Sequence, residues 1–168
     1  AEVETSNLIR NGDFEEPGEP PPEWNVNASE GGSVDLAPDA LTGTKALKIS
    51  LPGEGSATVI SEPCDVTAGE DYLLTFWYRA DGMSAKGSDY DGCAATCYII
   101  WQDAGGKEVG RTLSNLPYGP VTDYRVSTLT ATAPEDAATA CLRYDANVGQ
   151  DYKGPATALF IDQVRLMK

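Results

Sequence analysis

Acidic side chains stand near both ends of the chain at spacings that suit a hard metal ion. In the opening segment NLIRNGDFE (7–15), Asp13 and Glu15 are two residues apart, so in a strand they point to one face. Asp162 lies in the closing segment ALFIDQVRL. If the end segments pair, these carboxylates and a backbone carbonyl near Lys45 could bind calcium, which prefers oxygen ligands. The sequence predicts a structural Ca²⁺ site; the plain alternative is solvated acids at strand ends.

A second set of side chains suits sugar binding, because a sugar packs its CH-rich face on an aromatic ring while its hydroxyls bond charged or amide groups. In YLLTFWYRA (72–80), alternation turns Leu74, Phe76 and Tyr78 to the core and Trp77 outward. In ATACLRYD (138–145) it turns Leu142 and Tyr144 to the core and Arg143 and Asp145 outward. We therefore expect Trp77 to be the aromatic platform.

If the strands are neighbours, further contacts on the same face would come from Arg79, Tyr98, Gln102 and Arg143. Tyr118 and Tyr124, at or beside a long loop, could wall the groove, and Asn147 is a further candidate. Ordinary packing is the alternative for each tyrosine. Packing is also the expected role of the other two tryptophans, Trp101 in the core and Trp24 at the proline turn.

The composition argues against catalysis by this chain. It contains no histidine, which excludes catalytic dyads and triads that use one. Glycosidase chemistry needs two carboxylates, and 26 acidic residues could supply such a pair by chance. However, no acid is framed by the apolar residues that would raise its pKa. The sequence predicts a noncatalytic protein.

Four cysteines, Cys64, Cys93, Cys97 and Cys141, form no CxxC pair and have no histidine to complete a zinc site. Two disulfides are the favoured interpretation. Cys93 and Cys97 are close enough in sequence to bridge, which leaves Cys64 with Cys141, although four cysteines allow three pairings. Disulfides would place the protein in an oxidising compartment, as a secreted or extracellular protein. The alternative is four reduced thiols.

Length and charge limit the organisation and the partners. The 168 residues fit a single domain, which we place at 7–168 after a flexible tail at 1–6. The formal charge of 12 − 26 = −14 repels phosphate backbones and anionic membranes, so neither nucleic acid nor a membrane is an expected partner. No run of about 18 apolar residues occurs.

Strand signals dominate the chain, and helix signals are nearly absent. Besides the opening segment and SVDLA (33–37), segments rich in β-branched and aromatic residues occupy 46–51, 57–61, 72–80, 97–103, 124–133, 138–145 and 157–166. Turn clusters rich in proline and glycine separate them. This pattern predicts an all-β fold, a two-sheet antiparallel β-sandwich. The segments 81–96 and 104–123 are too long for tight turns and are predicted to be loops.

Several blocks resemble the jelly-roll carbohydrate-binding modules of families 4, 9, 16 and 22, which share a galactose-binding-like fold. They include NLIRNGDFE, TGTKALKI, VTAGEDYLLTFWYRA, WQDAGG, TATAPEDAATACLRYDA and LFIDQVRL, in the right order. By resemblance, Trp77 matches a cleft tryptophan, and Asp13, Glu15 and Asp162 match the region of a calcium site. Tyr124 stands where many relatives have tryptophan, and the cysteines and the 81–96 loop are not part of the common pattern.

The resemblance implies a noncatalytic module that binds a polysaccharide of xylan or β-glucan type in a cleft on a concave sheet. Such a module is often an appendage of a secreted glycoside hydrolase, so we expect a monomer tethered to other domains. The alternative is a protein-interaction or surface-anchoring module, because this sandwich carries unrelated functions.

Overall fold

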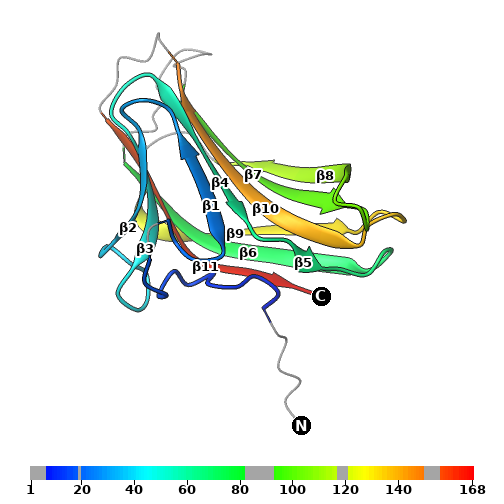
Figure 1. Cartoon of the computed structure of the whole chain (residues 1–168). Coiled ribbons are helices and arrows are strands. Elements are labelled where there is room, and N and C mark those ends of the chain that lie inside the picture. The colour runs from blue at the N-terminus through cyan, green and yellow to red at the C-terminus, as the bar shows by residue number, and fades with distance from the viewer. Residues whose placement is uncertain (1–6, 19, 82–92, 117–120, 150–155) are drawn as a thin grey trace.

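The computed structural model describes residues 7–18, 20–81, 93–116, 121–149 and 156–168, and these residues form two antiparallel β-sheets packed face to face (Figure 1). Sheet A has the order β1 (Trp24–Ala28), β4 (Gly55–Ser61), β10 (Thr139–Val148), β7 (Cys93–Gln102) and β8 (Glu108–Asn115), with β5 (Cys64–Asp65) beside β10. Sheet B has the order β2 (Ser33–Ala37), β3 (Ala46–Leu51), β11 (Thr157–Met167), β6 (Asp71–Asp81) and β9 (Val121–Thr132). The predicted all-β sandwich is confirmed. Within the described part of the chain, no helix is long and apolar enough to cross a membrane.

Alternation assigned the core residues correctly. Leu74 and Phe76 of β6 and Leu142 and Tyr144 of β10 are fully buried between the sheets. The ring of Phe76 meets that of Tyr144 edge to face, with centroids 5.1 Å apart. Trp101 of β7 is also a core residue, as predicted. Alternation predicts these residues correctly because one face of each strand packs against the other sheet and is shielded from water.

The predicted loop 104–123 is wrong, because most of it is strand. A tight turn closes after β7, where Asp103 N donates to Lys107 O at 2.8 Å and Gly106 adopts φ 84°. The chain then returns as β8. The other predicted loop, 81–96, is shortened, since β7 begins at Cys93; residues 82–92 lie outside the described part.

The two ends of the chain lie together, but the first segment is not a strand. Leu8 N donates to Leu166 O at 2.9 Å, and Val164 N donates to Gly12 O at 2.8 Å. Asn11, between these contacts, and Phe14, just after them, have positive φ values of 50° and 59°, which a strand does not allow. The predicted pairing of the ends is therefore right, and the predicted opening strand is wrong.

The opening segment also holds a buried aromatic contact. Phe14 is fully buried, with its ring centroid 5.2 Å from that of Trp24, and Trp24 Nε1 donates to Asn11 O at 3.1 Å. Trp24 therefore fixes the turn before β1, as the sequence predicted. Turn conformations at Asn11 and Phe14, not strand alternation, direct these side chains.

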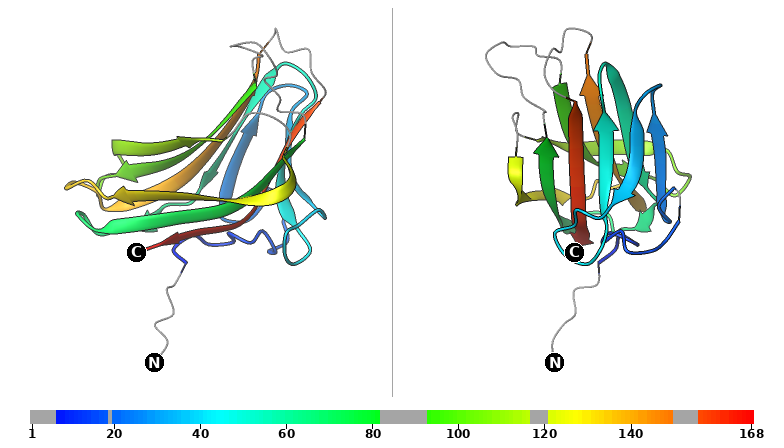
Figure 2. Two further views of the ribbon diagram at one scale, coloured as in Figure 1. Left: turned by 180° about the vertical axis from the view of Figure 1, so that it is seen from behind. Right: turned by 90° about the vertical axis from the view of Figure 1, so that its left-hand side faces the viewer.

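The sandwich is bent. In Figure 1 and in the left view of Figure 2, the strands of sheet A curve together, and the outer face of sheet A lies on the inside of the bend. The outer face of sheet B lies on the outside. The two outer faces therefore differ in shape before any side chain is considered.

Candidate functional site

The residues predicted to bind a ligand are divided between the two outer faces. Trp77 and Arg79 project from β6, and Tyr124 belongs to β9, so all three lie on sheet B. The strands of sheet A carry Tyr98, Gln102, Arg143 and Asn147. The expectation of one shared face is wrong, because β6 and β10 belong to different sheets. Tyr118 lies outside the described residues.

Sheet A presents two complete rows of side chains on its outer face. The strand registers align the first row as Asn25, Ile60, Arg143, Tyr98 and Leu113. The second row is Asn27, Thr58, Asp145, Thr96 and Asn115. Neighbouring residues in a row are about 4.8 Å apart, the spacing of strands in a sheet. The face therefore alternates apolar surface with amide, hydroxyl and charged groups across all five strands.

Tyr98 of β7 stands between two guanidinium groups. The Cζ atom of Arg111, on β8, is 5.5 Å from the centroid of its ring, and that of Arg143, on β10, is 5.9 Å away. Both distances are within the range of cation–π attraction. The ring is half-buried, and the adjacent Ile100 is only 8% exposed. An aromatic ring flanked by donors thus lies at the middle of the face.

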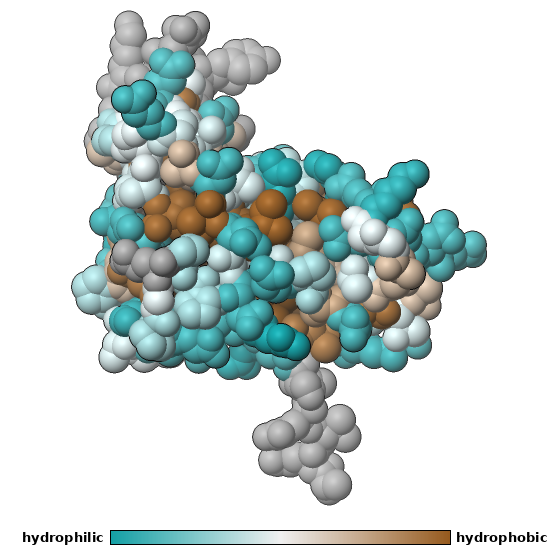
Figure 3. Space-filling model, in the orientation of Figure 1, coloured by the Kyte–Doolittle hydropathy of each residue, from teal (hydrophilic) through white to brown (hydrophobic). Residues whose placement is uncertain are grey.

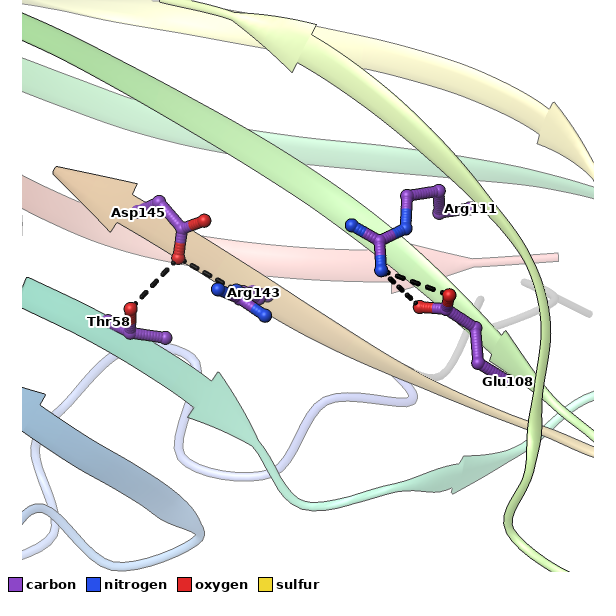
Figure 4. A network of polar contacts seen from close by, with 5 residues as sticks. All are labelled: Thr58, Glu108, Arg111, Arg143 and Asp145. Atoms are coloured by element: carbon purple, nitrogen blue, oxygen red, sulfur yellow. Dashed lines mark hydrogen bonds and ion pairs between the residues drawn. The ribbon is translucent and has the colours of Figure 1, made fainter. Parts of the chain in front are cut away.

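Carboxylates hold both guanidinium groups in place (Figure 4). Arg143 Nε donates to Asp145 Oδ1 at 2.8 Å, and Thr58 Oγ1 donates to the same oxygen at 3.1 Å. This bond to Asp145 raises the pKa of Arg143. Arg111 Nη2 contacts both oxygens of Glu108, at 2.7 and 3.0 Å. The donors are thereby oriented before any ligand arrives.

The remaining surface of sheet A suits a polar, CH-rich ligand. In Figure 3 apolar residues form a band with hydrophilic residues on either side, and the outward apolar residues of sheet A include Ile60, Ile100 and Leu113. Asn147 is exposed, and Gln102 accepts a bond from Thr139 Oγ1 at 3.2 Å. The face therefore combines a narrow apolar floor with amide groups at its margin.

Four residues of this network, Thr58, Glu108, Arg111 and Asp145, were missing from the predicted ligand set. Alternation had turned Asp145 outward, but nothing marked it as the partner of Arg143. Arg111 lies in a segment that was predicted to be a loop and forms strand β8 instead. Thr58 meets Asp145 only through the pairing of β4 with β10, which are 87 residues apart at this point. The sequence patterns lacked one kind of information, namely which strands distant in sequence pair with each other and in what register.

A strap formed by residues 38–45 covers part of the outer face of sheet B. The carboxylate of Asp162 is fully buried, and its Oδ2 accepts bonds from Leu41 N at 3.0 Å and Thr42 N at 3.3 Å. Tyr124 donates its hydroxyl to Asp39 O at 2.6 Å. Burial, followed by the charges of Asp162 and Asp39, raises the pKa of Tyr124 to about 12. The strap is fastened by side chains of β9 and β11.

Cations cover the aromatic ring beneath this face. Phe160 is 4% exposed, with Arg79 Cζ 4.0 Å and Lys48 Nζ 5.4 Å from its ring centroid. Arg79 also pairs with Asp39 and, at 2.9 Å, with Asp81. Trp77 points outward, as predicted, but is half-buried. Arg79 is thus engaged in holding the strap.

Two of the predicted metal ligands face the strap. Glu15 accepts bonds from Thr44 N and Lys45 N, both at 2.9 Å, and from Thr44 Oγ1 at 2.7 Å. The Lys45 amide and the Thr44 hydroxyl lower the pKa of Glu15. Burial raises the pKa of Asp162, and the charge of Glu15 adds to that shift. The two carboxylates are therefore close enough to interact.

Asp13 does not complete the predicted set of three carboxylates. Its side chain is exposed, and it accepts a bond from Glu15 N at 3.3 Å. Among the described residues no three acidic, histidine or cysteine side chains converge as metal ligands do. The positive φ of Phe14 breaks the strand that would have turned Asp13 and Glu15 the same way.

The predicted disulfides are not formed by the described cysteines. Cys93 and Cys97 lie on one extended strand, four residues and so about 13 Å apart, too far for a bridge. Cys64 lies opposite Ala140 and packs on the core, whereas Cys141 is on the outer face. The thiols of Cys64, Cys97 and Cys141 are free. Burial raises the pKa of Cys64 to about 11 and that of Cys97 to about 12, so both thiols are unreactive.

No family model and no curated protein matches the sequence, but solved structures match the fold. The enzymatically active domain of tailspike protein 4 of bacteriophage CBA120 has a TM-score of 0.72 at 18% identity over 96% of this chain, which spans 21% of the tailspike chain. A family 61 carbohydrate-binding module in complex with β-1,4-galactotriose has a TM-score of 0.60 at 15% identity, with 97% and 99% of the two chains covered. A cyclase from Fischerella sp. TAU has a TM-score of 0.64 at 21% identity, with 95% and 94% covered.

These identities are low enough that the likeness shows the fold alone. Carbohydrate-binding modules of families 4, 16 and 22 also match, with TM-scores of 0.58, 0.57 and 0.52. The same fold occurs in a phage enzyme domain and in a cyclase. The chain has the two-sheet β-sandwich fold of carbohydrate-binding modules, as its sequence blocks predicted.

Proposed function

We propose that this chain is a noncatalytic carbohydrate-binding module that holds a polysaccharide of xylan or β-glucan type across the outer face of sheet A. One observation carries the proposal: Tyr98 lies between two fixed guanidinium groups on the inside of the bend. The modules with the same fold support it. The sequence placed Trp77 at the centre of the site, and the proposal moves that centre to Tyr98.

The chemistry of the face fits a sugar chain. A pyranose ring can pack its CH-rich side against Tyr98 and the neighbouring, exposed Leu113. The free N–H groups of Arg143, the carboxylate of Asp145 and the amide of Asn147 can then bond the rim hydroxyls. Each bond to a charged group contributes about 1.5–3 kcal/mol when it excludes water. We expect dissociation constants between roughly millimolar and micromolar.

The acidic groups on this face favour binding over hydrolysis. A glycosidase needs one carboxylic acid kept protonated by an apolar environment. Here Asp145 and Glu108 are each paired with an arginine. A module without its own catalysis fits an appendage that keeps a secreted glycoside hydrolase on its substrate. One copy of the chain carries the whole face.

A panel of polysaccharides tests this function. Affinity electrophoresis of the intact chain in xylan, mixed-linkage β-glucan, laminarin, mannan and pectin should show retardation by xylan or a β-glucan. Y98A should lose that retardation, whereas the matched variant W77A, on the other face, should keep it. Retardation by none of the glycans, or loss with W77A alone, would contradict the proposal. Release of reducing ends during incubation would show that the chain is an enzyme.

A structural calcium ion between Glu15 and Asp162 is a second proposal. Its support is the donor set: two carboxylates that interact across the 41–45 segment, one of them fully buried, with hard oxygen atoms of the kind calcium prefers. The backbone carbonyl of Lys45 could add a further ligand. A bound cation would offset the repulsion between the carboxylates. We expect EDTA to lower the melting temperature and calcium to restore it; an unchanged melting temperature would leave only an acidic pair.

A further inference from the structure

The four edge strands of the sandwich are unequal. Sheet A ends in β1 and β8, and sheet B ends in β2 and β9. The strands β1 and β2 have only five residues each, and β8 has eight, with an irregular register near its start. In contrast, β9 has twelve residues, and no described strand pairs with its outer edge. One edge therefore presents a long row of backbone groups.

The edge of β9 lacks the features that usually prevent pairing. Natural edge strands are short, bulged, or carry proline or charged side chains. The register of β9 with β6 shifts near its start, between Tyr78 and Ala80, and is regular from Arg125 to Thr132. That regular run, RVSTLTAT, has no proline, glycine or acidic residue, and its one charge is at its first position. β-branched residues of this kind favour sheet.

An exposed apolar side chain and a hollow lie on the same outer side of this run. Val126 faces outward beside Trp77 and is 49% exposed. Near the other end of the run, Thr130 and Leu73 help to line an open hollow of about 540 Å³. Thr128 lies midway between Val126 and Thr130. The side chain of Val126 and the hollow at Thr130 thus lie two residues on either side of Thr128.

We propose that β9 pairs with β9 of a second copy of this chain, in antiparallel register centred on Thr128. In a two-fold pairing each residue before the centre faces the equivalent residue after it. Val126 of each copy therefore lies opposite Thr130 of the other, where it can enter the hollow. The two five-stranded sheets join into one continuous sheet. The family resemblance implied a monomer, and this proposal departs from that expectation.

The net charge of the chain makes the pairing of two copies depend on salt concentration. Each chain carries a formal charge of −14, so two copies repel over long range. The regular run of β9 keeps acidic side chains out of the pairing surface itself. Salt screens charges separated by more than about 8 Å at physiological ionic strength. The dimer should therefore form more readily at physiological salt than at low salt.

Paired charge variants at Thr128 test the register. Sedimentation velocity of the intact chain from about 1 to about 300 μM should show a monomer–dimer equilibrium. T128K and T128D should each remain monomeric, because like charges meet at the centre, and an equimolar mixture of the two should dimerise again. The exposed Thr67, in the turn before β6, provides the matched control: T67K and T67D should dimerise like the native chain.

Three outcomes would overturn the proposal: a native chain that stays monomeric over the whole range, Thr128 variants that dimerise separately, or a mixture that does not recover the dimer. V126A should weaken dimerisation about fivefold to tenfold, because each copy loses apolar side-chain area that the pairing buries. Circular dichroism checks that each variant is folded. We expect the Thr128 variants to fold, because Thr128 is exposed. Glycan binding is not a readout, so the dimer and the glycan-binding face succeed or fail separately.

Discussion

The two outer faces of the sandwich carry similar residues, but one face is partly covered by the chain and the other is accessible. Each has an arginine near an aromatic ring: Arg143 with Tyr98 on sheet A, and Arg79 with Phe160 on sheet B. On sheet B a strap crosses the face, and Phe160 is left only 4% exposed. On sheet A the described residues form no such strap, and Tyr98 stays half-buried. The same residue types therefore build a covered layer on one face and an accessible surface on the other.

The difference teaches that the path of the chain, more than residue type, decides which face can bind a ligand. The segment joining β2 to β3 is eight residues long, from Pro38 to Lys45, and crosses sheet B, where Asp162 and Tyr124 fasten it. Trp77 was the most attractive residue in the sequence because of its type and outward direction. It lies on the face that the strap partly covers.

The largest expected effect is a loss of stability on the covered face. F160A removes a buried ring and leaves a cavity beneath Arg79 and Lys48, which should lower the free energy of unfolding by about 3 kcal/mol. Y98A removes a half-buried ring from an open face and should cost about 1 kcal/mol or less. Urea unfolding followed by tryptophan fluorescence measures both. Equal losses would mean that the two faces are equally part of the core.

The next largest effect is a difference in glycan affinity between variants of Arg143 and Arg79. R143A should weaken binding roughly tenfold, about 1.4 kcal/mol, because it removes donors beside Tyr98. R79A should leave affinity unchanged and lower stability by about 1–2 kcal/mol, since it removes two ion pairs and the contact with Phe160. Isothermal titration with the glycan found in the panel, beside unfolding curves, gives both numbers. A weaker affinity for R79A would place the ligand on sheet B.

The fold could be predicted further from the sequence than the site could. Alternation in 72–80 identified Leu74 and Phe76 as core correctly, because burial on one face is a local property of a strand. Alternation also turned Trp77 and Arg143 outward, and both do face outward. It could not say that their strands lie in different sheets. That fact depends on the order in which distant strands pair, which no local pattern contains.

The remaining errors have the same origin. β8 was taken for a loop because its inward residues are small, Gly110, Thr112 and Ser114, and give no hydrophobic alternation. The disulfide between Cys93 and Cys97 was inferred from sequence distance, and an extended strand makes that distance too long. In each case the missing information was the tertiary neighbour, not the residue type.

The smallest expected effect tests how the strap is held, through its dependence on pH. The strap amides and the Thr44 hydroxyl lower the pKa of Glu15 below its ordinary value of 4.5, so ionised Glu15 stabilises the folded state above pH 4.5, and this contribution is lost as the pH falls through the lowered pKa. The pKa of Asp162 is raised by burial, so its ionisation acts in the opposite sense as the pH rises above 3.8. E15Q should lower the melting temperature by a few degrees at neutral pH, and the two curves should converge in acid. E16Q, at an exposed neighbour, is the matched control and should leave the curve unchanged. A constant gap between E15Q and the native chain down to pH 3 would mean that the charge of Glu15 does not hold the strap, and that sheet B is covered by packing alone.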